Sequence, residues 1–308
     1  MTGARLSSKS KQMDSSVSRN AELPQALEIL APAEQVVPLV FASPHSGRDY
    51  PSAFLSQTAL DPLTLRRSED TYVDELFAAA PELGAPLLRA LFPRAFVDPN
   101  REPYELDPGM FSDPLPDYAN IRSPRVAAGL GTVARVVANG AEIYNRRLPF
   151  AEAEQRIATC YRPYHTALQG LIQATVARFG CCLLIDCHSM PSVGGPTDKD
   201  NGLSRVDFVL GDCFGSSCSP LVIDTADRAL RAQGWRVVRN APYAGGFTTR
   251  HYGRPGTNVH ALQIETNRRL YMNETSHTKT AAFDRVATDL TALIRALAKI
   301  PPVALTTI

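Results

Sequence analysis

Three widely separated positions carry the side-chain types that bind a catalytic metal ion. His45 follows an apolar stretch, the pair Glu69 and Asp70 opens a helical pattern, and His188 ends another apolar stretch. Two histidines and one carboxylate, with a fourth position left to water, form a common ligand set for catalytic zinc. Zinc lowers the pKa of its water towards about 7 and so supplies hydroxide at neutral pH.

Each of these residues also has a purely structural interpretation. His45 could occupy a turn, Asp70 could cap a helix, and His188 could be a hydrogen-bonded core histidine. The three positions are far apart in the sequence. The metal hypothesis therefore depends on whether the fold brings them together.

Glu265 is the candidate general base, because it ends the apolar run 261–265 and a buried carboxylate there needs a partner. A glutamate beside an activated water can take its proton and pass it to the leaving amine. The alternative is a structural ion pair with Arg268 or Arg269.

Arginines supply candidate substrate contacts, since their guanidinium groups bind carboxylates with two parallel hydrogen bonds. Asn100 and Arg101 follow a predicted strand, and Arg250, His251 and Arg254 lie in a glycine-rich stretch. Any one of these arginines could instead be a solvated surface residue.

Composition and missing motifs exclude several other classes of protein. The net charge of +1 offers no electrostatic case for binding nucleic acid or an anionic membrane. There is no G-x-S-x-G elbow, P-loop or G-x-G-x-x-G fingerprint, and no apolar stretch of about 18 residues. The six cysteines form no C-x-x-C pair, which favours buried free thiols in a reducing cytoplasm.

Short apolar runs alternate with helical patterns along the chain, which predicts an α/β fold: a three-layer α/β/α sandwich with a mixed, largely parallel sheet. We expect 1–22 to be a disordered leader and 23–308 to form a single catalytic domain. Asp186 and His188 share one face of a predicted strand, as do Gln263 and Glu265. The expected strands are 39–43, 87–92, 183–190, 206–210, 235–239 and 261–265, and the expected helices are 60–80 in its second part, 151–179 with a kink at Pro163, 221–232 and 283–297.

Six stretches in this order resemble the N-formylglutamate amidohydrolase family. They cover roughly residues 38 to 298. They are Ser43-Pro44-His45-Ser46-Gly47-Arg48, Glu69-Asp70-Thr71, Val97-Asp98-Pro99-Asn100-Arg101, Asp186-Cys187-His188-Ser189-Met190, Thr249-Arg250-His251-Tyr252-Gly253 and Gln263-Ile264-Glu265-Thr266-Asn267-Arg268.

The resemblance implies a fold similar to zinc-dependent carboxypeptidases and one zinc ion held by His45, His188 and a carboxylate. It also implies Glu265 as the base and Asn100 with Arg101 as the carboxylate-binding pair. Relatives of that fold place the carboxylate ligand three residues after the first histidine, where this chain has Arg48. The expected ligand is therefore Asp70 rather than Glu69, with Asp186 orienting the site from behind.

The activity implied is hydrolysis of N-formyl-L-glutamate to formate and L-glutamate, as in histidine degradation. The alternatives are hydrolysis of another N-acyl amino acid or small peptide, and a non-catalytic protein of the same fold that binds an anionic ligand. The expected partner is a small N-acyl amino acid, with no nucleic acid or membrane. The oligomeric state, and whether 103–124 closes over the site, are left open.

Overall fold

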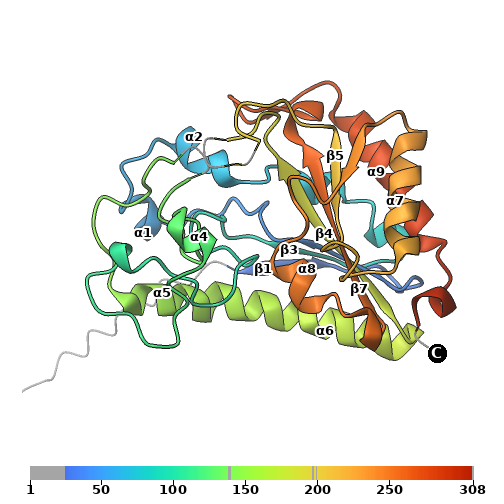
Figure 1. Ribbon diagram of the computed structural model, residues 1–308, viewed down its shortest axis with the longest axis horizontal. Helices are drawn as coiled ribbons and strands as arrows, with labels where there is room; N and C mark the ends of the chain where they lie inside the picture. The colour runs from blue at the N-terminus through green and yellow to red at the C-terminus, as the bar shows by residue number, and fades with distance from the viewer. Residues whose placement is uncertain (1–24, 138–139, 196–197, 199, 307–308) are drawn as a thin grey trace, which may run out of the picture.

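A seven-stranded mixed sheet lies at the centre of the protein, seen in a computed structural model that describes residues 25–137, 140–195, 198 and 200–306 (Figure 1). The strand order is β1-β3-β2-β4-β7-β5-β6. The central strands β3, β2, β4 and β7 run parallel, whereas β1 and β5 pair antiparallel with β3 and β7. The strands are β1 Leu27–Leu30, β2 Leu39–Ser43, β3 Leu87–Ala90, β4 Cys182–Met190, β5 Phe208–Gly211, β6 Val237–Arg239 and β7 Val259–Asn267.

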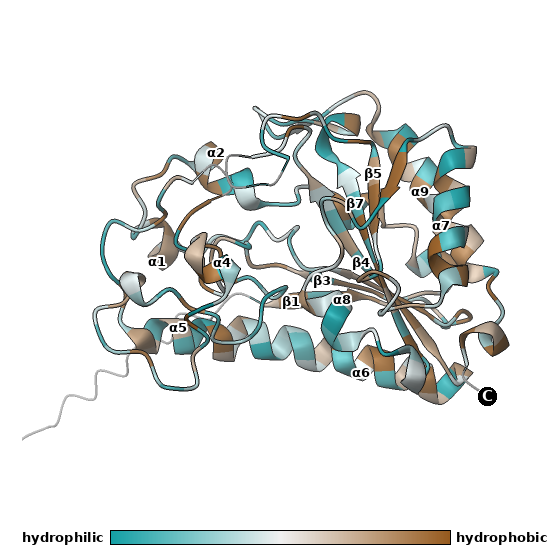
Figure 2. Cartoon of the chain, in the orientation of Figure 1, coloured by the Kyte–Doolittle hydropathy of each residue, from teal (hydrophilic) through white to brown (hydrophobic). Residues whose placement is uncertain are grey.

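Helices cover both faces of the sheet, so the expected mixed α/β sandwich is confirmed. The long helix α6 (Arg162–Phe179) packs on one face, and α7 (Pro220–Ala232) and α9 (Phe283–Ala298) pack on the other (Figure 1). The strands are largely hydrophobic, while the outer helices alternate between apolar and polar faces (Figure 2). The apolar faces of the helices meet the sheet and bury two separate clusters of core side chains.

The remaining elements are short and surround the sheet and its helices. The expected leader 1–22 lies outside the described residues. No helix of the described chain is long and apolar enough to cross a membrane. The further helices are α1 Ser52–Leu55, α2 Pro62–Leu65, α3 Val73–Leu76, α4 Pro124–Ala127, α5 Phe150–Arg156 and α8 Phe247–Tyr252, and a small hairpin joins β8 Met272–Asn273 to β9 Thr278–Lys279.

The predicted helix over 151–179 is present, but Pro163 changes its geometry locally. Helix α5 passes through a π-helical segment, Ile157–Tyr161, before α6 begins at Arg162. Proline has no N–H to donate and its ring crowds the preceding turn. The wider π turn just before Pro163 accommodates the proline, so the helix continues instead of ending.

The two longest strands present their polar residues on the same face. In β4, the even-numbered Cys182 and Leu184 belong to the core cluster under α6, and Asp186 and His188 continue that face towards the carboxyl end. Parallel pairing places Asp186 beside Gln263 and His188 beside Glu265. Paired residues in neighbouring strands point to the same face of the sheet. These four polar side chains therefore lie together on one face, near the carboxyl ends of β4 and β7.

Gly47, directly after the turn that carries His45, has no room for a side chain. An added Cβ would lie 2.1 Å from the carbonyl oxygen of Phe92 and 2.6 Å from the carbonyl carbon of Leu91. Both are backbone atoms, so relief of the contact requires the chain to move.

We expect Gly47→Ala to lower the free energy of unfolding by about 1–3 kcal/mol, the usual cost of overpacking. The matched control is Gly170→Ala on the exposed face of α6, where an added Cβ meets nothing within 4 Å. That change should be neutral or stabilising by up to about 1 kcal/mol, because alanine favours a helix interior. Urea denaturation of both variants tests the comparison, and equal effects at the two positions would contradict it.

Candidate metal and active site

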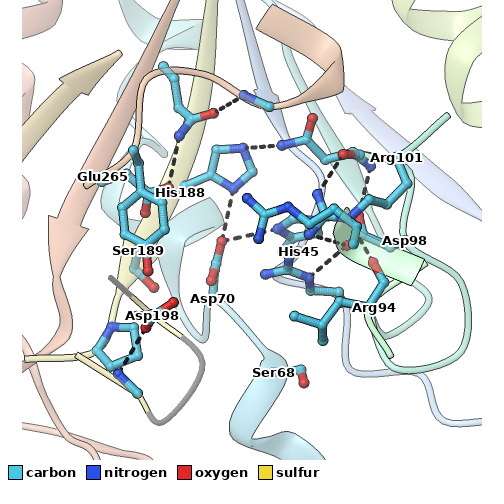
Figure 3. Close-up of a pocket in the computed structure, with 18 of the residues that line it drawn as sticks. His45, Ser68, Asp70, Arg94, Asp98, Arg101, His188, Ser189, Asp198 and Glu265 are labelled. Carbon is cyan, nitrogen blue, oxygen red and sulfur yellow. Dashed lines mark hydrogen bonds and ion pairs between the residues drawn. The ribbon is translucent and has the colours of Figure 1, made fainter. Parts of the chain in front are cut away.

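A cavity of about 200 Å³ opens at the carboxyl ends of β2, β4 and β7. In open α/β sheets, ligands bind just beyond the carboxyl ends of the strands. His45, Asp70, His188 and Glu265 all line the cavity (Figure 3). The fold therefore brings together the residues that the sequence predicted as metal ligands and as the general base.

His45, Asp70 and His188 point towards one another in the lining of this cavity (Figure 3). Asp70 Oδ2 lies 3.3 Å from His45 Nδ1 and 3.0 Å from His188 Nδ1. One ligand atom from each residue falls within 4.8 Å of the other two, and all three residues are buried. Two imidazole nitrogens and one carboxylate oxygen in this arrangement fit a divalent transition metal.

The second nitrogen of each imidazole faces a buried carboxylate. His45 Nε2 lies 2.7 Å from Asp98 Oδ1, and His188 Nε2 lies 2.9 Å from Asp186 Oδ1. The His188 contact is not aligned as a hydrogen bond, so Asp186 acts on that ring chiefly through its charge. Metal-binding histidines characteristically have such a carboxylate behind them, which fixes the ring and its tautomer.

Asp98 was not assigned a role from the sequence. It accepts hydrogen bonds from Arg94 Nε at 2.9 Å and from the backbone N–H of Asn100 at 2.8 Å. Burial disfavours its charged form, but Arg94, His45 and Arg101 outweigh that effect and hold the pKa of Asp98 well below its usual range. Its place in the stretch 97–101 was the signal that could have revealed it.

Glu69, the alternative carboxylate ligand, faces away from the two histidines. It accepts hydrogen bonds from Tyr50 Oη at 2.6 Å, Thr71 Oγ1 at 3.0 Å and Arg66 Nε at 3.1 Å. Asp70, in contrast, is held next to His45 because its backbone N–H donates to the His45 carbonyl at 3.0 Å. The geometry therefore favours Asp70 over Glu69 as the ligand.

Glu265 projects into the cavity beside His188, its partner on the neighbouring strand. Its Oε1 accepts a hydrogen bond from Gln263 Nε2 at 2.9 Å, and Gln263 Oε1 accepts from the backbone N–H of Gly246 at 2.7 Å. Burial raises the pKa of Glu265 to about 7, with His188 opposing and Asp70 adding to the shift. Such a pKa suits a group that takes and returns a proton near neutral pH.

The structural alternative for Glu265, an ion pair with Arg268 or Arg269, does not form. Arg268 Nη2 bonds to Asp70 Oδ1 at 2.9 Å, and Arg269 Nη2 bonds to Asp207 Oδ1 at 3.1 Å. Glu265 thus has no structural ion pair with either arginine.

Asn100 and Arg101 line the same cavity. Asn100 Nδ2 lies 3.1 Å from His188 Nε2, and its Oδ1 accepts from the backbone N–H of Thr248 at 2.8 Å. Arg101 donates from Nε to the Leu130 carbonyl at 2.9 Å. Burial lowers the pKa of Arg101 to about 10, with Asp98 opposing and the nearby cations Arg94 and Arg125 adding to the shift.

The other three predicted substrate contacts lie elsewhere. Arg250 and His251 are exposed on α8 and Arg254 is exposed just beyond it, and none of them is among the residues that line the cavity. Arg250 Nη1 donates to the carbonyl of Gly245 at 3.0 Å, and the His251 ring stacks on Phe247. The lining of the cavity instead includes four arginines that were not predicted as substrate contacts, namely Arg67, Arg94, Arg125 and Arg268.

The loop over 103–124, whose role as a lid was left open, contributes no lining residue to the cavity. The segment that follows it does so through Arg125, Leu130, Gly131 and Ala134. The Ser123 hydroxyl caps α4 by accepting from the Val126 N–H at 3.0 Å, and α4 carries Arg125.

Separate substitutions of Asp70 and Glu69 test which of the two carboxylates is the metal ligand. We expect Asp70→Asn to weaken the binding of a divalent metal by at least about 100-fold, since even outer partners of a metal ligand contribute about 10- to 100-fold. Glu69→Gln should keep the metal affinity and lose only about 1–3 kcal/mol of stability, because its hydrogen bonds weaken. Chelator competition and thermal unfolding measure the two effects, and the reverse pattern would make Glu69 the ligand.

Comparison with known proteins agrees with this architecture. A model of the N-formylglutamate amidohydrolase family matches residues 37–272. N-formylglutamate deformylases of Pseudomonas aeruginosa and Pseudomonas putida are 32% and 30% identical, over 80% and 78% of this chain and 86% and 83% of their own lengths.

Two solved structures match along most of their lengths. The crystal structure of N-formylglutamate amidohydrolase from Ralstonia eutropha is 36% identical, with a TM-score of 0.81 over 89% of this chain and 98% of that one. A gene product of Agrobacterium tumefaciens, 20% identical, shares the fold with a TM-score of 0.57 over 90% of this chain and 96% of its own. The chain therefore belongs to the N-formylglutamate amidohydrolase family and is a hydrolase of amide carbon–nitrogen bonds.

Proposed function

We propose that this protein is a zinc-dependent deformylase that hydrolyses N-formyl-L-glutamate to formate and L-glutamate. The observation that carries the proposal is the position of Glu265 beside the buried cluster of His45, Asp70 and His188, in one cavity. Two imidazoles and one carboxylate are the donors of a three-ligand catalytic zinc site. The named activity of the relatives supplies the substrate.

Zinc bound at this cluster would polarise the formyl carbonyl and lower the pKa of a water molecule. Glu265 takes one proton from the attacking water and delivers it to the amide nitrogen as the bond to carbon breaks. Gln263 holds Oε1 of Glu265, which leaves Oε2 as the atom that carries the proton. One water is consumed, and its second proton passes from the new carboxyl group to the released amine, so the products are formate and L-glutamate with a protonated amino group.

The charge of the cavity suits a substrate with two carboxylates. Its lining includes five arginines and four carboxylates, and three of the carboxylates, Asp70, Asp98 and Asp198, are already ion-paired. Arg67 and Arg125 are exposed at the wall, and neither has a carboxylate partner among the described residues. The bound metal would add further positive charge, so an anionic substrate would be attracted.

We assign the α-carboxylate of the substrate to Asn100 and Arg101 and the side-chain carboxylate to Arg125. Arg125 replaces Arg250 and Arg254 in this role, because those two lie outside the cavity. Burial is the main cause of the lowered pKa of Arg101, and the positive charges of Arg94 and Arg125 add to it, so like charges face each other along this wall. A dianion lying along this wall would relieve that repulsion.

The proposed products connect the reaction to histidine degradation, which yields glutamate. We further propose a cytoplasmic location, supported by six cysteines that form no disulfide.

The direct experiment combines metal analysis with a substrate panel. Purified protein should contain about one zinc per chain and should prefer N-formylglutamate over N-acetylglutamate, N-formylglutamine and small peptides. Preference for an acetyl or peptide substrate would make the protein a hydrolase of another N-acyl compound. A protein that takes up no metal, even after reconstitution, would contradict the proposed zinc dependence and the mechanism built on His45, Asp70 and His188.

Glu265→Gln tests the assignment of the base. The variant should lower kcat by about 10²- to 10⁴-fold, the usual contribution of a positioned acid–base group, and keep its zinc. The control Glu142→Gln removes a carboxylate whose side chain is 68% exposed in a surface pair with Arg135, and it should keep full activity. Near-normal turnover in the Glu265 variant would show that another group moves the proton.

Arg125→Gln tests the contact with the side-chain carboxylate. Loss of one charge-assisted contact at a partly solvated site should raise KM for N-formylglutamate about tenfold, since such bonds contribute about 1.5–3 kcal/mol when fully formed. Turnover of N-formylglutamine, which lacks that charge, should change much less. Arg122→Gln is the matched control, because Arg122 is exposed on the same segment but does not line the cavity. Equal losses on both substrates would show that Arg125 does not bind the side-chain carboxylate.

A further inference from the structure

The two oxygens of the Asp70 carboxylate serve different partners. Oδ2 faces His45 Nδ1 and His188 Nδ1, where the metal would bind. Oδ1 accepts a hydrogen bond from Arg268 Nη2 at 2.9 Å. Asp70 is 1% exposed and Arg268 is 6% exposed, so this ion pair is largely shielded from bulk solvent.

Three segments hold the Arg268 guanidinium in this position. Besides Asp70 Oδ1, Nε donates to Ser189 Oγ at 3.1 Å and Nη1 donates to the Arg67 carbonyl at 3.2 Å. Each of its three nitrogens therefore has a separate acceptor, and the planar fork is fixed at every corner. Rotation away from Asp70 would break three hydrogen bonds in a buried setting.

We infer that Arg268 is a positioning residue that restricts Asp70 to metal binding through a single oxygen. A carboxylate can bind a cation with one oxygen or with both, and an arginine bonded to Oδ1 competes with a metal for that oxygen, which favours binding through Oδ2. A catalytic site with three protein ligands needs a remaining position for water or substrate. Binding of Asp70 through one oxygen would keep that position free.

The neighbouring arginine shows that this role belongs to Arg268 and is not a general property of the segment. Arg269 is directed away from the cavity, its side chain is 39% exposed, and it pairs with Asp207. The two arginines are adjacent on the turn Arg268–Leu270. Arg268 nevertheless bonds to the buried Asp70, whereas Arg269 pairs with Asp207. This contrast provides a matched control for the experiment.

The inference rests on the proposed metal dependence and is tested without an activity assay. Wild type, Arg268→Gln, Arg268→Lys and the control Arg269→Gln are compared by chelator competition for zinc and by the visible absorption of the cobalt-substituted proteins. Cobalt absorption is strong in four-coordinate sites and weak in higher-coordinate ones, so it reports how many ligand atoms surround the ion. Thermal unfolding of the metal-free proteins shows which variants fold.

We expect Arg268→Gln to lower zinc affinity about 10- to 100-fold and to weaken the cobalt absorption as Asp70 Oδ1 joins the ligands. Arg268→Lys keeps the charge but cannot reach all three acceptors, so it should fall between this variant and wild type. Arg269→Gln should match wild type in both measurements.

Ser189→Ala, which removes only the Nε acceptor, provides a milder variant if Arg268→Gln does not fold. It should move zinc affinity and the cobalt spectrum in the same direction by a smaller amount. Unchanged zinc affinity and spectrum in the folded Arg268 variants would overturn the inference and leave the proposed deformylase intact. Lower stability with an unchanged spectrum would do the same, by reducing Arg268 to a structural role. Failure of wild type to bind zinc or cobalt would overturn both proposals.

Discussion

The interaction on which the site depends is the meeting of Asp70 Oδ2 with the Nδ1 atoms of His45 and His188. It places an ionised carboxylate inside the protein, where an unpaired charge would cost several kcal/mol. Burial opposes the charge, but His188, His45 and Arg268 outweigh it and hold the pKa of Asp70 well below its usual range. Asp98 is kept ionised in the same way by Arg94 and His45. The arginines therefore help to keep the carboxylates of Asp70 and Asp98 ionised inside this cavity.

The sheet supplies the positions that this network requires. Four functional groups come from the adjacent parallel strands β4 and β7, whose register fixes Asp186 beside Gln263 and His188 beside Glu265. A one-residue shift in that register would turn one set of side chains into the opposite core. The packed apolar residues Ile185, Cys187 and Ile264 on the other face prevent such a shift. Hydrophobic packing on one face therefore sets the distances between polar groups on the other.

This dependence explains which features could be predicted from the sequence. The faces of His188 and Glu265 follow from strand periodicity, and the fold follows from the alternation of apolar runs and helical patterns. Asp98 and Arg125 could not be found in this way, because Asp98 lies in a loop and Arg125 in the single-turn helix α4, and long-range contacts such as Arg101 Nε to the Leu130 carbonyl set the path of these segments. The prediction that Arg250, His251 and Arg254 in the glycine-rich stretch contact the substrate failed for the same reason. That stretch does reach the cavity through Gly245 and Gly246, but it then forms α8, which leaves Arg250 exposed.

The helix α6 and the π-helical segment before it also support the site, because their side chains bond to backbone carbonyls of the loop after β3. His165 Nε2 lies 2.8 Å from the Pro99 carbonyl, and Tyr161 Oη donates to the Arg101 carbonyl at 2.8 Å. These contacts hold the Asn100–Arg101 segment from both sides, so the two side chains enter the cavity from a fixed backbone. Tyr161 is the last residue of the π-helical segment before Pro163. A wider turn rotates the residues that follow it relative to an uninterrupted α-helix, so the irregularity at Pro163 helps to set which side chains face this loop.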